Sequence, residues 1–252
     1  MSFEVAADAY GRFMGRYSEK LAVKLADVAG VVAGQTALDV GCGPGGLTAV
    51  LVERLGASHV AALDPSVRFV EAARSRLPGV DIRLASAEDI PFDDGSFDVA
   101  LAELVVHFMS DPVAGLREMA RVTKPGGTIA ACVWDHGGDT GALSPFWKVA
   151  RAVDPGLDDE SGLAGAREGQ LAELFGAAGL RDIRSTRLTV HVDYTDFEEW
   201  WEPFTLGVGP AGAYVASLDE TGRAALKSAC AASLPTGPFT IEASAWTAIA
   251  TV

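Results

Sequence analysis

A short glycine-rich segment constrains the fold of this chain more than any other feature. An apolar stretch, Thr36-Ala-Leu-Asp-Val40, runs into Gly41-Cys-Gly-Pro-Gly-Gly46, and a helical pattern resumes from Leu47 to Leu55. Short apolar runs bounded by glycine are typical of buried strands, and glycine tolerates the backbone angles of a tight turn. The segment is therefore predicted to form a strand, a glycine turn and a helix.

The same alternation of strands and helices continues to residue 133. The expected strands are 59–63, 80–84, 97–102 and 127–133, and the expected helices are 66–77 and 112–122. Successive units of this kind bury both faces of a parallel sheet through right-handed crossovers. We therefore predict a doubly wound α/β fold with its ligands at the carboxyl ends of the strands.

Segments on both sides of this core complete the chain. Residues 4–33 carry apolar side chains at helical spacing and are expected to form an N-terminal helical cap. Residues 135–165 are rich in Gly, Pro and Asp and are expected to contain a short helix at 146–153. After them, helices are expected at 168–178, 195–204 and 221–234, and strands at 183–192 and 239–252. Because no repeat or low-complexity linker interrupts the sequence, we expect a single domain over 1–252, made of a cap (1–33), a core (34–134) and a roof with the C-terminal strands (135–252).

The spacing of the glycines indicates an adenosine ligand. Gly41, Gly43 and Gly46 fit G-x-G-x-x-G, and Asp64 follows 21 residues after Gly43, where an acidic residue can hold ribose hydroxyls. NAD and S-adenosylmethionine both satisfy this pattern. Asp39 precedes the loop by two residues and would repel a pyrophosphate but attract S-adenosylmethionine, whose net charge is about +1. An NAD(P)-dependent oxidoreductase and a glycine turn without a ligand remain alternatives at this point.

The net charge of the chain limits the classes of partner that it can bind. It carries 20 Lys and Arg against 34 Asp and Glu, a formal net charge of −14. Such a surface repels nucleic acid and anionic lipid, so we expect a small-molecule partner, no nucleic acid, no membrane, and a monomer or homodimer. Cys42, Cys132 and Cys230 are widely spaced, which fits a reducing compartment. Without a recognisable leader, a cytoplasmic location is expected.

Four motifs in order resemble the class I S-adenosylmethionine-dependent methyltransferases. They are Leu38-Asp-Val-Gly-Cys-Gly-Pro-Gly-Gly46, Asp64, Ala87-Glu-Asp-Ile-Pro-Phe-Asp-Asp-Gly-Ser-Phe-Asp98 and Arg121-Val-Thr-Lys-Pro-Gly-Gly127. The resemblance covers residues 8–134 and is greatest to the small-molecule group similar to ubiquinone/menaquinone-biosynthesis C-methyltransferases. It implies S-adenosylmethionine as cofactor and a Rossmann-like seven-stranded sheet whose last strand runs antiparallel.

The resemblance also implies positions for the cofactor contacts. The methionine end is expected to contact Asp39, Gly41, Gly43 and the backbone of Ala102. The ribose and adenine are expected to contact Asp64, Pro65, Ser66, Ser86 and Ala87. The expected contacts from the cap are Tyr10, Met14 and Arg16. Ser86 departs from the family pattern, which usually has Asp there. Its hydroxyl is shorter and neutral, so the backbone of Ala87 is the firmer expectation for adenine.

Methyl transfer from a sulfonium needs alignment and exclusion of water more than a dedicated base. The candidate bases are His107, Glu103 and His136. Glu103 and His107 are four residues apart, so we expect them to share a helical face, with the carboxylate orienting the imidazole. A packing or capping role for His107 is the alternative. We expect no metal, because Glu103, His107 and Asp111 lack a second histidine pair.

The methyl acceptor is inferred mainly from what the sequence lacks. The fourth expected strand ends in Ala102-Glu-Leu-Val105, without the Asn/Asp-Pro-Pro-aromatic signature of methyltransferases that act on exocyclic amines of nucleic acids. Aromatic residues of the expected roof are candidates for an acceptor pocket or for the core: Trp134, Trp147, Trp200, Trp201 and Phe204. A small, apolar or aromatic metabolite is therefore expected. A catalytically inactive S-adenosylmethionine-binding protein is a further alternative.

Overall fold

A seven-stranded sheet organises the molecule, a computed structural model that describes residues 7–252; residues 4–6 of the expected cap lie outside them. The strands are β1 (Ala37–Val40), β2 (Val60–Asp64), β3 (Asp81–Leu84), β4 (Phe97–Glu103), β5 (Thr123–Trp134), β6 (Arg181–Tyr194) and β7 (Phe239–Thr251). Their order is β3-β2-β1-β4-β5-β7-β6. The first five strands pair in parallel, and β7 is antiparallel to both β5 and β6. The predicted fold class is confirmed.

Helices and short helical turns connect and cover the strands. The α-helices are α1 (Ala7–Tyr10), α2 (Arg16–Val28), α3 (Gly46–Leu55), α4 (Val67–Arg76), α5 (Pro112–Val122), α6 (Ser144–Val153), α7 (Gln170–Ala177), α8 (Phe197–Trp201), α9 (Gly209–Ser217) and α10 (Glu220–Ser233). The short turns are η1 (Gly11–Gly15), η2 (Ala57–His59), η3 (Val106–Phe108), η4 (Glu160–Gly162) and η5 (Glu202–Leu206).

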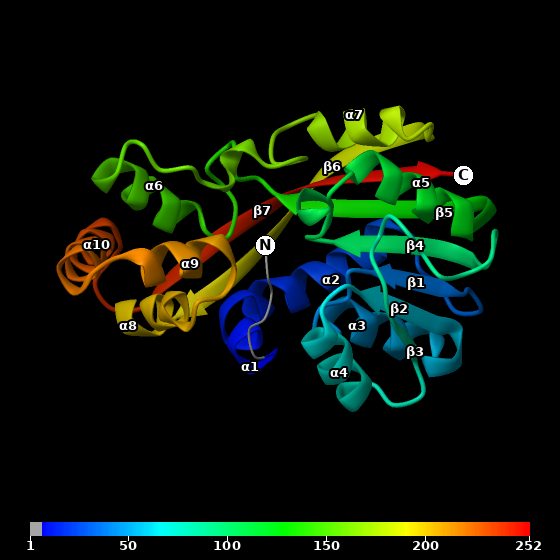
Figure 1. The fold of residues 1–252 in the computed structure, drawn as a ribbon, viewed down its shortest axis with the longest axis horizontal. Helices are drawn as coiled ribbons and strands as arrows, with labels where there is room; N and C mark the ends of the chain where they lie inside the picture. Colours follow the sequence, from blue (N-terminus) through cyan, green and yellow to red (C-terminus); the bar gives the residue numbers. More distant parts are fainter. Residues whose placement is uncertain (1–6) are drawn as a thin grey trace.

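The sheet has a helical layer on each face. Side chains of α2 and α3 pack in one core cluster, and those of α5 and α7 pack in a second cluster on the other face (Figure 1). Every residue of the central strand β1 is buried, as expected for a parallel strand covered on both sides. No helix of the described residues has the length and apolar character that crossing a bilayer requires.

The strands β6 and β7 extend beyond the rest of the sheet and carry the roof. Tyr194 pairs with Phe239 at the far end of this two-stranded ribbon, and α6, α8, α9 and α10 gather there (Figure 1). Since β6 runs in the direction of β5, this end lies on the same side as the carboxyl ends of the parallel strands. The Phe146 ring stacks on Phe204 with centroids 4.5 Å apart, so aromatic packing holds the roof together.

Several helices differ from their expected limits by one or two residues, and two differ more. The cap helix ends at Val28 and not near residue 33, because Gly30 adopts a left-handed φ of 72° that stops the helix. The helix expected at 195–204 is divided into α8 and the turn η5. In contrast, α5 has the predicted bounds: Asp111 accepts from the Ala114 N–H at 3.0 Å as its N-cap, and Pro112 occupies the first turn.

Candidate active site

The glycine turn after β1 packs closely against Val105, which follows β4. Gly41 and Gly43 have φ values of 73° and 53°, and the N–H groups of Gly41 and Cys42 both donate to the Leu63 carbonyl, at 2.8 and 2.9 Å. A Cβ on Gly41 would lie 2.6 Å from Val105 Cγ1. Glycine is therefore required there both by the backbone angle and by the close approach.

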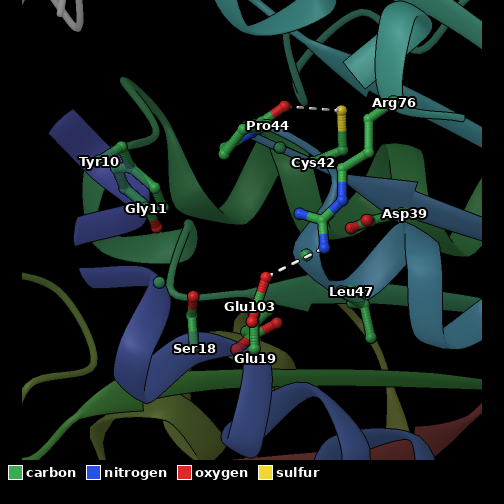
Figure 2. A pocket seen from close by; sticks show the side chains of 14 residues that line it. Tyr10, Gly11, Ser18, Glu19, Asp39, Cys42, Pro44, Leu47, Arg76 and Glu103 are labelled. Atoms are coloured by element: carbon green, nitrogen blue, oxygen red, sulfur yellow. Dashed lines mark hydrogen bonds and ion pairs between the residues drawn. The ribbon is translucent and has the colours of Figure 1, made fainter. Parts of the chain in front are cut away.

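A cavity opens beside this turn, and we call it the glycine-loop cavity (Figure 2). Its lining comes from the cap, the loop, the end of β4 and the end of α4: Tyr10, Gly11, Gly15, Ser18, Glu19, Asp39, Gly41, Cys42, Gly43, Pro44, Gly46, Leu47, Arg76 and Glu103. Arg76 pairs with Glu19 across it at 3.0 Å. Both of these side chains are substantially exposed, at 44% and 57%, so their pairing contributes little to stability.

Buried carboxyl groups give the glycine-loop cavity its electrostatic character. Asp39 accepts from the Thr48 hydroxyl at 2.6 Å, and burial raises its pKa to about 7. Burial, followed by the charges of Asp39 and Glu19, raises the pKa of Glu103 well above its usual range. Among the described residues, Glu103 Oε1 has no hydrogen-bond partner. A cation bound in this cavity would lower both raised pKa values, because the ionised carboxylates of Asp39 and Glu103 would stabilise its charge.

Asp64 is held at the edge of the glycine turn by backbone donors. Its Oδ2 accepts from the Gly43 N–H at 2.9 Å, and its Oδ1 accepts from the Ser66 N–H at 2.8 Å. Burial raises the pKa of Asp64, and these two hydrogen bonds oppose the shift. The carboxylate is thus fixed in place while each oxygen keeps a second lone pair for a ligand.

The other cofactor positions implied by the resemblance are not among the residues that line the glycine-loop cavity. Pro65 and Ser66 connect β2 to α4, where the Ser66 hydroxyl caps the helix by accepting from the Phe69 N–H. Ser86 and Ala87 follow β3, and Ala102 is fully buried within β4. The sheet brings all five to the carboxyl edge, on the same side as the glycine turn.

The three cap residues have different surroundings. Tyr10 lines the glycine-loop cavity and packs edge-on against Phe69 of α4, with ring centroids 5.5 Å apart. The Trp134 indole N–H donates to Met14 Sδ at 3.3 Å. Arg16 pairs with Glu199 at 2.9 Å and lies over the Tyr194 ring. Tyr10 therefore faces the glycine-loop cavity, whereas Arg16 connects the cap to the roof through Glu199 and Tyr194.

A second cavity lies under the roof, and we call it the histidine cavity. Its lining is mostly apolar: Tyr10, Phe13, Met14, Leu104, His107, Phe108, Trp134, His136, Leu143, Glu160, Val208, Gly209 and Pro210. Tyr10 lines both cavities. Of the candidate roof aromatics only Trp134 appears in this lining; Trp147, Trp200, Trp201 and Phe204 are buried in the core.

The expectation that Glu103 and His107 share a helical face is wrong. Glu103 is the last residue of β4 and lines the glycine-loop cavity, whereas His107 lies in the turn η3 and lines the histidine cavity. Leu104, between them, has a left-handed φ of 59°, which interrupts any helix through both residues. The partners of His107 are instead on other elements.

His136 and Glu160 are the polar neighbours of His107 in the histidine cavity. The ring centroids of His107 and His136 are 6.2 Å apart, and His136 Nε2 lies 4.0 Å from Glu160 Oε1. Burial lowers the pKa of His107 to about 3 and that of His136 to about 4, and it raises the pKa of Glu160 to about 7. Both imidazoles are thus neutral near pH 7. Sequence analysis missed Glu160, because it lies in a Gly- and Asp-rich segment with no motif.

Comparison with known proteins agrees with this architecture. Residues 38–131 match the family described as a methyltransferase domain. The chain is 36% identical over 135 residues to an uncharacterized methyltransferase of Mycobacterium tuberculosis, covering 54% of this chain and 52% of that protein. It is 40% identical over 104 residues to demethylmenaquinone methyltransferase of Clavibacter sepedonicus, covering 40% of this chain and 42% of that protein. The matched part of this chain spans about half the length of these curated relatives.

A solved structure shares the fold. Phosphoethanolamine N-methyltransferase 2 of Haemonchus contortus, in complex with phosphomonomethylethanolamine and S-adenosylhomocysteine, is similar with a TM-score of 0.60 and 19% identity, covering 98% of this chain and 56% of that chain. Residues 38–131 therefore form a methyltransferase domain, similar to those of the class I S-adenosylmethionine-dependent methyltransferases.

Proposed function

We propose that this protein transfers a methyl group from S-adenosylmethionine to a small, apolar or aromatic metabolite. One observation carries the proposal: Tyr10 lines both the acidic glycine-loop cavity and the largely apolar histidine cavity. A cofactor site and an acceptor site that share a wall can bring two reactants into line. S-adenosylmethionine supplies a methyl group on a positively charged sulfur, from which a nucleophile takes it by in-line displacement.

The glycine-loop cavity suits this cofactor by charge and by shape. Asp39 and Glu103 offer buried carboxylates to a ligand whose net charge is about +1. At Gly43 no atom lies within 4 Å of where a Cβ would stand, so the backbone there can approach a ligand closely. We assign Asp64 to the ribose hydroxyls, since its carboxylate is fixed by the N–H groups of Gly43 and Ser66.

The same charges disfavour a nicotinamide dinucleotide. Of the described residues that line the glycine-loop cavity, Arg76 alone is basic, and it is paired with Glu19. A pyrophosphate would then face Asp39 and Glu103 without a free cation to neutralise it. An oxidoreductase is therefore the weaker proposal for this site.

The histidine cavity favours an acceptor that is apolar over most of its surface. Phe13, Leu104 and Trp134 are among its walls, and apolar walls of this kind exclude water from a reacting pair. His107 is the candidate to contact the reacting end of the acceptor, because its neutral imidazole can accept a proton or a hydrogen bond there. Glu103 is better placed to act on the cofactor than on the acceptor.

The test is transfer of a labelled methyl group. The purified protein is incubated with S-adenosylmethionine labelled in the methyl carbon and with a fractionated metabolite extract, and label is followed into apolar and polar fractions. We expect protein-dependent label in the apolar or aromatic fraction. Label only in polar, charged compounds would contradict the acceptor class, and cofactor binding without any transfer would favour an inactive binding protein.

A further inference from the structure

We infer that His107, His136 and Glu160 form a binding site for a divalent cation of the zinc type, with one open ligand position facing the histidine cavity. One donor atom from each residue lies within 4.8 Å of the donors of the other two. The three residues come from η3, from the position two residues after β5 and from η4. Segments distant in the sequence thus converge on one point in the wall of the cavity.

Unpartnered nitrogen atoms are the second observation. Both ring nitrogens of His136 and the Nδ1 of His107 are buried, and within the described part of the chain they have no hydrogen-bond partner. His136 is 4% exposed and His107 is 7% exposed. Buried imidazoles nearly always have a partner, so three such nitrogens around one cavity indicate a ligand that supplies the missing bonds.

The carboxylate of the cluster is oriented as it would be in a metal site. The Trp147 indole N–H donates to Glu160 Oε2 at 2.7 Å, which leaves Oε1 on the side of His136, 4.0 Å from its Nε2. Hydrogen bonds that orient ligands in this way are general in metal centres. Next to Glu160, Asp159 accepts from the Ser161 N–H at 2.9 Å and pairs with Arg151, which fixes the start of η4.

The backbone beside His136 is fixed as well. Asp135 accepts from the Gly138 N–H at 2.8 Å and from the Thr140 hydroxyl at 2.7 Å. This closed turn sets the direction in which His136 leaves β5. The backbone next to His136 and Glu160 is thus fixed by the hydrogen bonds of Asp135 and Asp159, and His107 lies in the turn η3.

The donor set points to the class of ion. Two imidazoles and one carboxylate, with a fourth position left for water or substrate, form the set found in catalytic zinc sites. Tetrahedral zinc–donor bonds of about 2.1 Å place the donors roughly 3.4 Å apart, so the donor atoms must approach one another by roughly 0.6–1.4 Å around the ion. Side-chain rotation in a cavity can provide a movement of this size.

The inference deepens the proposed function, on which it rests for its biological role. An ion at this point would bind an oxygen donor of the acceptor, so it selects hydroxylated aromatic compounds among the apolar metabolites. His107 then acts as a ligand and not as a base. Binding of the ion can be measured without any acceptor, so the metal site is tested independently of methyl transfer.

The experiment is a zinc titration of the untagged full chain after treatment with EDTA and removal of the chelator. Calorimetry is expected to give one Zn²⁺ per chain, and Co²⁺ is expected to give the visible absorption of a tetrahedral centre. His136→Ala and Glu160→Gln should each lower zinc affinity at least about 100-fold. His191→Ala is the matched control, because His191 also faces a glutamate, Glu242 at 3.1 Å, but on the exposed surface; it should bind zinc like the parent protein.

A milder variant covers the case in which a ligand variant does not fold. Trp147→Phe keeps all three ligands and removes only the hydrogen bond to Glu160, so zinc affinity should fall about 10-fold. Thermal unfolding of every variant reports whether it is folded. The inference is overturned if the parent protein binds no zinc, or if zinc binding is unchanged in both His136→Ala and Glu160→Gln. Binding of S-adenosylhomocysteine is measured on the same samples: zinc binding without it supports the site and counts against the proposed function alone.

Discussion

Val105 occupies the space that a side chain on Gly41 would need: a Cβ there would lie 2.6 Å from Val105 Cγ1. Gly41 also has a φ of 73°. We therefore predict that Gly41→Ala lowers the free energy of unfolding by about 2–4 kcal/mol, from left-handed strain and overpacking together. Urea denaturation measures the loss.

Gly30→Ala is the matched control for this prediction. Gly30 has nearly the same φ, 72°, but no atom lies within 4 Å of its hypothetical Cβ. This variant should lose only about 1 kcal/mol, the strain alone. Equal losses in the two variants would show that the contact between Gly41 and Val105 contributes nothing.

The raised pKa of Asp39 predicts that the affinity for the cofactor increases with pH. Burial raises its pKa to about 7 in the free protein, and a cationic ligand beside it favours the ionised form. Affinity for S-adenosylhomocysteine, whose ammonium group is positive, should therefore increase from pH 6 to pH 8 and then level off. Calorimetry in two buffers with different ionisation enthalpies should detect proton release on binding below pH 7.

In the free protein, by contrast, the contribution of Asp39 to stability should decrease as pH rises. A carboxyl group whose pKa is raised on folding binds more protons in the folded state, so its contribution to stability falls as pH rises from about 4 to 7. Asp39→Asn should remove this loss, stabilising the free protein at pH 8 by about 4 kcal/mol, while weakening cofactor binding. A variant with unchanged stability and unchanged affinity would contradict the role of this carboxylate.

Asp64 provides a test of the ribose assignment. Its carboxylate is held by the N–H groups of Gly43 and Ser66, and charged hydrogen bonds to hydroxyls contribute roughly 1.5–3 kcal/mol each. Asp64→Ala should weaken binding of S-adenosylhomocysteine about 100-fold or more. Asp64→Asn keeps one acceptor oxygen and should lose less. Unchanged affinity in Asp64→Ala, measured by calorimetry, would refute the assignment.

His107 and Glu103 should have separable effects, since they line different cavities. His107→Ala is expected to lower turnover at least about 100-fold with affinity for S-adenosylhomocysteine within twofold of the parent. Glu103→Gln should weaken cofactor binding more than it lowers turnover at saturating cofactor. Initial-rate kinetics combined with calorimetry distinguish these patterns. Turnover of the parent level in His107→Ala would remove this residue from the acceptor site.

The local sequence predicted those parts of the fold that local interactions determine. The glycine turn and α5 are examples: glycines fix the first, and the Asp111 cap with Pro112 fixes the second. Helix α9 was not expected, because Gly209 and Pro210 at its start are typical of loops. Ala211 and Val215 of this helix are buried in the core, a tertiary contact that the local pattern does not contain.

The histidine cavity depended on contacts that no local pattern contains. Glu160 approaches His136 only because α6 and η4 fold back under the roof, where Trp147 holds the carboxylate. The four-residue spacing of Glu103 and His107 predicted a helix that the left-handed backbone of Leu104 prevents. Motif and spacing thus pointed to residues around the glycine-loop cavity, whereas most residues of the histidine cavity required the three-dimensional structure.

Parallel calorimetric titrations with S-adenosylhomocysteine and NADH test the central claim most directly. The buried carboxylates of Asp39 and Glu103 in the glycine-loop cavity predict saturable one-to-one binding of S-adenosylhomocysteine and no binding of NADH. Saturable binding of NADH without binding of S-adenosylhomocysteine would contradict the account and restore a dehydrogenase.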